Sequence, residues 1–184
     1  MDTATRGALF VTTDQFLAKA KAGPWPAFKA GSALDPSAEA FLRGIYDDAS
    51  IDELGELSIE DLAALAHDFW IWRSARAPDE QVARIRPGIG AGGRALERDI
   101  LEVVGPDMPF LVDSVMGEVG DEGLAALAMF HPTAPATSGT GRDSLIQIHV
   151  PKLSAARAKA LLDGVRGTLA DVRVAVTDFK AMRE

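Results

Sequence analysis

The 184-residue sequence predicts an α+β protein in which a small helical segment precedes a βαββαβ unit. Three observations lead to this prediction. Apolar residues recur at helical spacing between Asp35 and Arg73, a run rich in glycine and proline interrupts that pattern, and short apolar runs then alternate with longer amphipathic ones. Because apolar residues make up 47% of the chain, it can bury a core of this kind.

The first 86 residues are divided into two parts. Residues 1–34 are poorly specified beyond one short helix. Residues 35–86 form an acidic helical segment, in which Pro36 suits the first position of one helix. Ser58 and Asp61 have the spacing of a capping box, so a second, stronger helix is expected to begin there.

Residues 87–94 contain the string PGIGAGG and are predicted to be a glycine-rich linker. Gly88, Gly90 and Gly93 match the dinucleotide-binding pattern G-x-G-x-x-G. That pattern requires a buried strand before the glycines and a long helix after them, and the sequence predicts neither. A linker is therefore the preferred interpretation, and no dinucleotide site is predicted.

Residues 95–184 are predicted to form the βαββαβ unit. The expected strands are residues 99–104, 124–130, 145–150 and 172–176. Asp107 can cap the first helix, with Pro109 in its first turn, and Ser154 can cap the second. Short connections and right-handed crossovers favour a ferredoxin-like sandwich, in which both helices cover one face of an antiparallel sheet.

Composition narrows the classes of function. Acidic residues exceed basic ones by 27 to 19, and the net charge of −8 disfavours nucleic acid or an anionic membrane as a partner. The chain has no cysteine, which excludes disulfides and thiolate metal sites. Its longest apolar run, residues 124–130, is far shorter than a membrane span, and the first residues lack a signal-peptide pattern. We therefore expect a cytoplasmic protein.

The sequence predicts no catalytic constellation and no metal site. The three histidines, His67, His131 and His149, do not have metal-ligand spacing, so structural roles are expected. His131, at the end of a predicted strand, is the best placed of them to contact a ligand. Asp113 and Ser114 are adjacent on a helix and point in different directions, so they do not form a nucleophile and its base.

A family resemblance rests on the segment Pro106–Leu124, PDMPFLVDSVMGEVGDEGL. It resembles the opening of an ACT domain, where D-x-P-G-L joins the first strand to the first helix. More specifically, DMPFLVDS followed by a strand that ends in His-Pro resembles the N-terminal region of the large bacterial NAD-specific glutamate dehydrogenases. The resemblance runs from about Phe41 to the end of the sequence. It implies an ACT-like domain within a much longer enzyme that interconverts glutamate with 2-oxoglutarate and ammonium.

The resemblance also implies what this chain contributes. In that family the NAD and glutamate sites lie downstream, so we expect this chain alone to be non-catalytic, with no cofactor and no metal. Two roles remain open: an architectural module that associates with the other domains of the parent enzyme and with itself, or an effector-binding module for an amino acid. Both roles point to one turn and a nearby strand end, formed by Gly105, Asp107, Met108, Pro109, Phe110, Leu111 and His131.

Phe110 distinguishes the two roles. The ACT pattern has glycine at this position, and the missing side chain lets the backbone approach an effector. A phenylalanine packed into that space would close the site. We therefore expect Phe110 to be partly or wholly buried, Phe110→Ala to lower the free energy of unfolding by roughly 2–4 kcal/mol, and the architectural role to be favoured.

Overall fold

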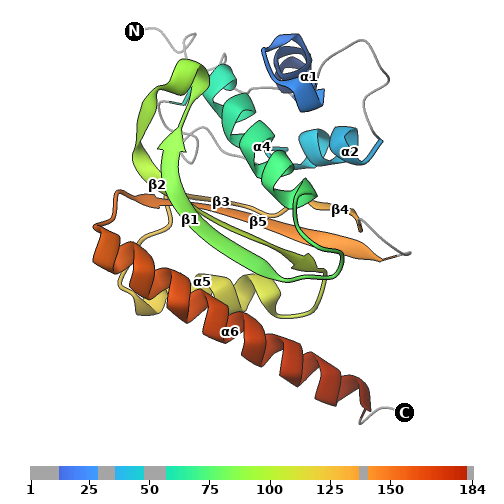
Figure 1. The fold of residues 1–184 in the computed structure, drawn as a ribbon, viewed down its shortest axis with the longest axis vertical. Coiled ribbons are helices and arrows are strands. Elements are labelled where there is room, and N and C mark those ends of the chain that lie inside the picture. Colours follow the sequence, from blue (N-terminus) through green and yellow to red (C-terminus); the bar gives the residue numbers. More distant parts are fainter. Residues whose placement is uncertain (1–12, 29–35, 48–56, 137–140, 182–184) are drawn as a thin grey trace, which may run out of the picture.

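The computed structural model describes residues 13–28, 36–47, 57–136 and 141–181, with side chains up to residue 176. These residues form three layers (Figure 1). One face of an antiparallel sheet is covered by α5 (Leu111–Asp121) and α6 (Ala155–Ala181). The other face is covered by α2 (Pro36–Gly44) and α4 (Ile59–Ser74), and α1 (Thr13–Ala22) packs on these two helices. None of the helices in these ranges is long and apolar enough to cross a membrane.

The sheet has the strand order β1-β2-β5-β3, and β4 pairs with another part of β5. The strands are β1 (Val82–Ile89), β2 (Ala95–Pro106), β3 (Ala128–Phe130), β4 (Thr133–Pro135) and β5 (Arg142–Pro151). β2 and β5 are central, and their register pairs Glu102 with Gln147. This register brings two polar residues from distant parts of the sequence onto one face of the sheet.

The predicted ferredoxin-like arrangement is confirmed, but its outer strand comes from the other side of the sequence. Residues 172–176 continue α6 and do not form a strand. The position beside β2 is taken by β1, which precedes it in the sequence. The strand was predicted from alternating valines, but Val172 also continues the apolar stripe that Val165 and Leu169 form on α6, and all three residues are buried.

Residues 87–94 are not a linker, because they belong to the hairpin that joins β1 to β2. Pro87 pairs with Asp99 in the ladder, and a short 3₁₀ helix, Ala91–Gly93, makes the turn. Gly92 has φ of 65°, which glycine adopts without the steric penalty of a side chain. β1 was hidden in the sequence because its alternation places arginines where a buried face would be expected to be apolar.

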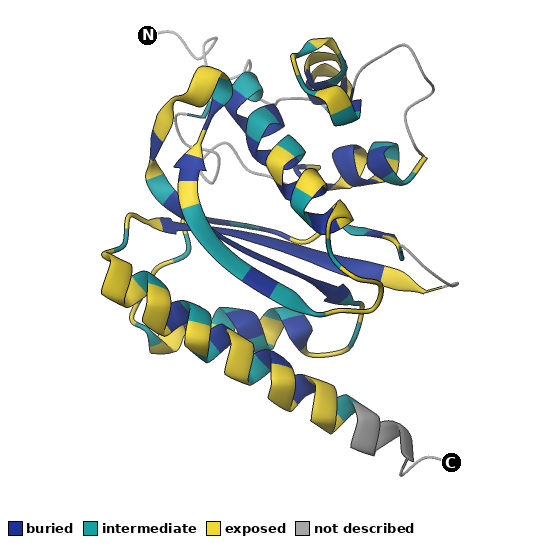
Figure 2. Ribbon diagram, in the orientation of Figure 1, coloured by how far each residue is buried: buried dark blue, intermediate teal, exposed yellow. Residues whose placement is uncertain are grey.

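Each face of the sheet has its own core (Figure 2). Toward α5 and α6, the buried residues include Leu101, Val103, Ile146, Val115 and Val165. On the opposite face, residues of the N-terminal helices share a core with β2, β3 and β5, including Phe41, Leu62, Phe69, Val104, Phe130 and Leu145. The acidic helical segment is therefore packed directly on the sheet.

The predicted start of α4 is confirmed. The Ser58 hydroxyl accepts a hydrogen bond from the Asp61 amide at 3.1 Å, and the Asp61 carboxylate accepts one from the Ser58 amide at 3.0 Å. This reciprocal capping box satisfies two amide donors at the start of the helix. It fixes the position of α4 over the sheet.

Candidate functional site

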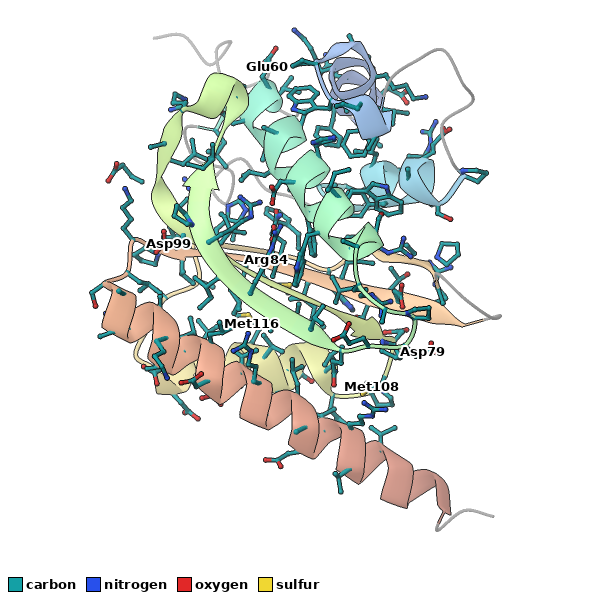
Figure 3. The ribbon with its side chains drawn as sticks, in the orientation of Figure 1. Glu60, Asp79, Arg84, Asp99, Met108 and Met116 are labelled. Carbon is teal, nitrogen blue, oxygen red and sulfur yellow. The ribbon has the colours of Figure 1, made fainter. Side chains whose placement is uncertain are left out.

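The turn predicted to carry function connects β2 to α5. Gly105 ends the buried part of β2, and a Cβ there would lie 2.9 Å from Cγ of Gln81. The Asp107 amide donates to the Arg142 carbonyl at 2.9 Å, which attaches the turn to β5. Met108 is half-buried at this end of the sheet (Figure 3), and Leu111 is buried at the start of α5. The turn is therefore anchored on both sides.

Phe110 differs from its prediction. Its side chain is 72% exposed, so the expectation that the ring fills a buried space is wrong. The residue has φ of 66° and ψ of −3°, a left-handed conformation at the N-cap of α5. Leu111, the next residue, turns inward in its place. The turn therefore keeps the backbone shape that a glycine would adopt, while the aromatic ring faces solvent.

We predict that Phe110→Gly stabilises the chain by about 0.5–1 kcal/mol, because a left-handed residue with a Cβ costs roughly 1–2 kcal/mol and the greater freedom of unfolded glycine offsets part of the gain. Phe110→Ala keeps the Cβ and loses only an exposed ring, so its free energy of unfolding should stay close to that of the native chain. Urea denaturation of the three proteins measures both effects. A loss of several kcal/mol in Phe110→Ala would contradict the exposed position of the ring.

His131 lies beside this turn. Its Nε2 forms a hydrogen bond with the hydroxyl of Ser144, and Ser144 is the register partner of Gly105. Partial burial lowers the pKa of His131, and the Asp107 carboxylate acts in the opposite direction. Ser144 is fully buried, so its hydroxyl cannot reach a substrate, and the contact with His131 does not make a nucleophile.

The sequence did not predict a second site, a buried polar network between the sheet and α4. Its centre is Glu102, which is fully buried. Arg84 Nε lies 2.6 Å from Oε2 of Glu102, and Arg86 NH2 lies 2.9 Å from Oε1. Asp68 of α4 pairs with both arginines, at 3.0 Å from Nε of Arg86. Figure 3 shows Arg84 in the space between the sheet and α4.

The charges of this network are balanced. Burial alone would lower the pKa of Arg86, but the Glu102 carboxylate more than compensates and raises it above its ordinary value. The Arg84 guanidinium also lies over the ring of Trp72, 4.4 Å from its centroid. The buried Glu102 thus has two partly buried arginines as partners, and the half-exposed Asp68 adds a second acid at the edge of the network.

Hydrogen bonds through three uncharged side chains, Gln147, Tyr46 and His149, extend the network along β5. Gln147 Nε2 donates to Glu102 Oε1 at 3.1 Å, and Gln147 Oε1 accepts from the Tyr46 hydroxyl at 3.1 Å. His149 Nε2 donates to the same Gln147 oxygen at 3.2 Å, while its Nδ1 accepts from Arg98 at 3.2 Å. His149 is therefore neutral, and burial together with the charges of Arg98 and Arg86 lowers its pKa to about 3.

We predict an acid-sensitive stability that depends on His149. Unfolded His149 binds a proton below about pH 6.5, whereas the folded side chain does so only near pH 3, so stability falls as the pH drops through this window. The slope contributed by this residue is about 1.4 kcal/mol per pH unit. Unfolding of the native chain and of His149→Gln, measured between about pH 5 and 6.5, should show a shallower slope in the variant. Equal slopes would show that the folded histidine titrates normally.

Close packing explains the glycine at position 90 of the hairpin. A Cβ on Gly90 would lie 2.1 Å from Oδ1 of Asp61, so only glycine lets the hairpin approach the start of α4 so closely. The same carboxylate accepts from the Ala91 amide at 3.0 Å and pairs with Arg94. The short turn is followed by the strand β2, and not by the long helix whose N-terminus holds the phosphates in a dinucleotide site. These residues do not fit an NAD molecule.

Metal ligands do not gather in the described ranges: no group of three or more histidine, aspartate or glutamate side chains there could hold an ion.

Comparison with known proteins agrees with this architecture. A family described as "Glutamate dehydrogenase, ACT1 domain" matches residues 41–160. The chain is also similar to the NAD-specific glutamate dehydrogenase of Pseudomonas aeruginosa, with 25% identity over 172 residues, covering 83% of this chain. It spans only 11% of the length of that relative. Because the family match extends over more than half of the sequence, this chain belongs to the family of glutamate dehydrogenase ACT1 domains.

Proposed function

We propose that this chain is a non-catalytic, N-terminal regulatory or architectural region of a cytoplasmic NAD-dependent glutamate dehydrogenase. The parent enzyme would convert glutamate to 2-oxoglutarate and ammonium in amino-acid catabolism, with the NAD site outside this region. The region would associate with other domains or subunits of that enzyme through the turn at Phe110. The observation that carries the proposal is the exposed ring of Phe110 on a left-handed residue.

Two physical arguments support an interface at this turn. A non-glycine residue held in the left-handed region costs of order 1–3 kcal/mol, and such strain is concentrated at functional positions. An exposed phenylalanine gains nothing from solvent, whereas a buried aromatic anchor supplies much of the binding energy of an interface. The neighbouring Leu111 and the bond between Asp107 and Arg142 hold the turn in place, so little ordering is required when a partner binds.

A second candidate function, binding of an amino-acid effector, is favoured by the backbone at Phe110. Its φ of 66° is the conformation that a glycine would adopt at the corresponding turn of an ACT domain. The Phe110 ring is exposed and does not fill the space beside this turn. The first amides of α5 follow directly and could bind a carboxylate. In this role the turn would sense an amino acid and transmit its presence to the enzyme.

The test compares Phe110→Asp with Ile71→Asp in the full-length enzyme. Ile71 is a second exposed apolar residue, 48% exposed on α4, and serves as the matched control. Sedimentation should show that Phe110→Asp weakens assembly while Ile71→Asp does not. Unchanged assembly in both variants would contradict the interface. Calorimetric titration of the native chain with glutamate, aspartate and arginine tests the effector role, which requires saturable binding that Phe110→Asp alters.

A further inference from the structure

A groove of about 580 Å³ lies between the outer strand β1 and helix α6. Gln81, Val82 and Ala83 form one wall, and α6 supplies the other with Leu169 and Val174. None of residues 107–111 lines it, so it is a different surface from the Phe110 turn. Val174 is 60% exposed, which leaves an apolar strip along the groove.

The outer edge of β1 is protected against pairing with another strand along only half of its length. β1 is the last strand of the sheet on its side, and no described strand pairs with its outer edge. Pro87 and the register shift between Pro87 and Ile89 interrupt the far half, as is common for strands that must not pair. The half beside the groove, residues 82–85, has no such interruption, and its Arg84 side chain is engaged with Glu102.

The groove is basic although the whole chain carries a net charge of −8. Arg166 and Arg173 of α6 line it and are exposed. The acid at its mouth, Glu80, accepts a hydrogen bond from the Ala77 amide at 3.2 Å and is thus held in its own turn. Nε2 of Gln81 is buried and has no hydrogen-bond partner among the described residues. These groups favour a partner that brings acceptors and negative charge.

We propose that this groove binds an extended acidic peptide segment, which adds to the sheet as a strand beside β1. Its backbone would pair with residues 82–85, and every second side chain would face α6, where apolar ones would contact Leu169 and Val174. Carboxylates at other positions on this same face would meet Arg166 and Arg173, which selects acidic over basic sequences. The proposal goes beyond the association at Phe110, because it names another surface and another class of partner.

The experiment uses two fluorescein-labelled peptides of equal length, one repeating Glu-Thr-Val-Thr and the other Lys-Thr-Val-Thr, so that in a strand the charged residues and the valines share one face. Fluorescence anisotropy with the full chain should show the acidic peptide binding at least about tenfold more tightly. Arg166→Glu combined with Arg173→Glu should reverse this preference. The control, Lys152→Glu combined with Lys159→Glu, makes the same change in charge outside the groove and should leave the preference intact. Matching thermal unfolding of the two double variants shows that both are folded.

Hydrogen exchange locates the binding. The acidic peptide should slow exchange of amides within residues 82–85. Three results would overturn the proposal: no saturable binding below about 1 mM, equal affinity for the two peptides, or protection confined to other residues. Concentration-dependent protection of the same amides without peptide would also overturn it, because the occupant would then be a second copy of this chain.

Discussion

Glu102→Ala should lower the free energy of unfolding by about 3–5 kcal/mol, because it leaves two partly buried guanidiniums without their shared carboxylate. Arg84 lies 2.6 Å and Arg86 2.9 Å from Glu102, and Gln147 would lose the acceptor for its amide as well. Asp68 would remain, but it is half exposed and cannot balance two charges. Chemical denaturation measures the loss.

A triple variant distinguishes the effect of the buried charges on stability from the effect of side-chain packing. Glu102→Leu together with Arg84→Met and Arg86→Met removes all the buried charges around the centre, so it should recover most of the stability lost in Glu102→Ala. Arg43→Ala, which breaks an exposed pair with Glu39, is a surface control and should change stability little. A Glu102→Ala variant as stable as this control would show that the network is open to water.

Asp143→Ala should have a comparable effect of about 3–5 kcal/mol at the C-terminal end of α4. Asp143 Oδ2 lies 3.0 Å from NH2 of Arg73, and Arg76 pairs with its other oxygen. All three side chains are at least 96% buried, so removing the acid leaves two interior cations. Arg73 also donates to the Pro135 carbonyl at 2.5 Å, which ties α4 to β4.

The measurement for Asp143→Ala combines denaturation with hydrogen exchange. Amides of β4 and of the last turn of α4 should exchange faster in the variant than those of β1. Asp163→Ala removes an acid that is half exposed on α6 and serves as the control. A loss of less than about 1 kcal/mol in Asp143→Ala would mean that water solvates the two arginines.

Features encoded by neighbouring residues could be predicted from the sequence. The start of α4 depends on Ser58 and Asp61 alone, so the spacing of two residues was sufficient. The connection between β2 and α5 was also predicted, because Gly105, Pro106 and Asp107 are turn-forming residues that follow an apolar run. The direction of the Phe110 side chain at that turn was predicted wrongly, because the identity of the residue does not indicate that its backbone is left-handed.

Features that depend on distant partners could not be predicted. Arg84 and Arg86 look like residues of a solvated strand until Glu102 is placed opposite them by the register. His149 and Gln147 similarly alternate with isoleucine and valine, a pattern that does not say which face meets another layer. The polar network therefore becomes visible only when β1, β2, β5 and α4 are assembled.

The place of the outer strand β1 in the sequence determines how α6 can separate from the sheet. When a strand follows the last helix and closes the sheet, that helix is fastened at both ends by the strand ladder. Here β1 pairs with its sequence neighbour β2, and the described residues include no strand after α6. Lifting α6 would therefore break side-chain packing and leave every backbone bond of the sheet intact. We expect α6 to unfold as a separate cooperative unit, with amides that exchange together and before those of β2 and β5.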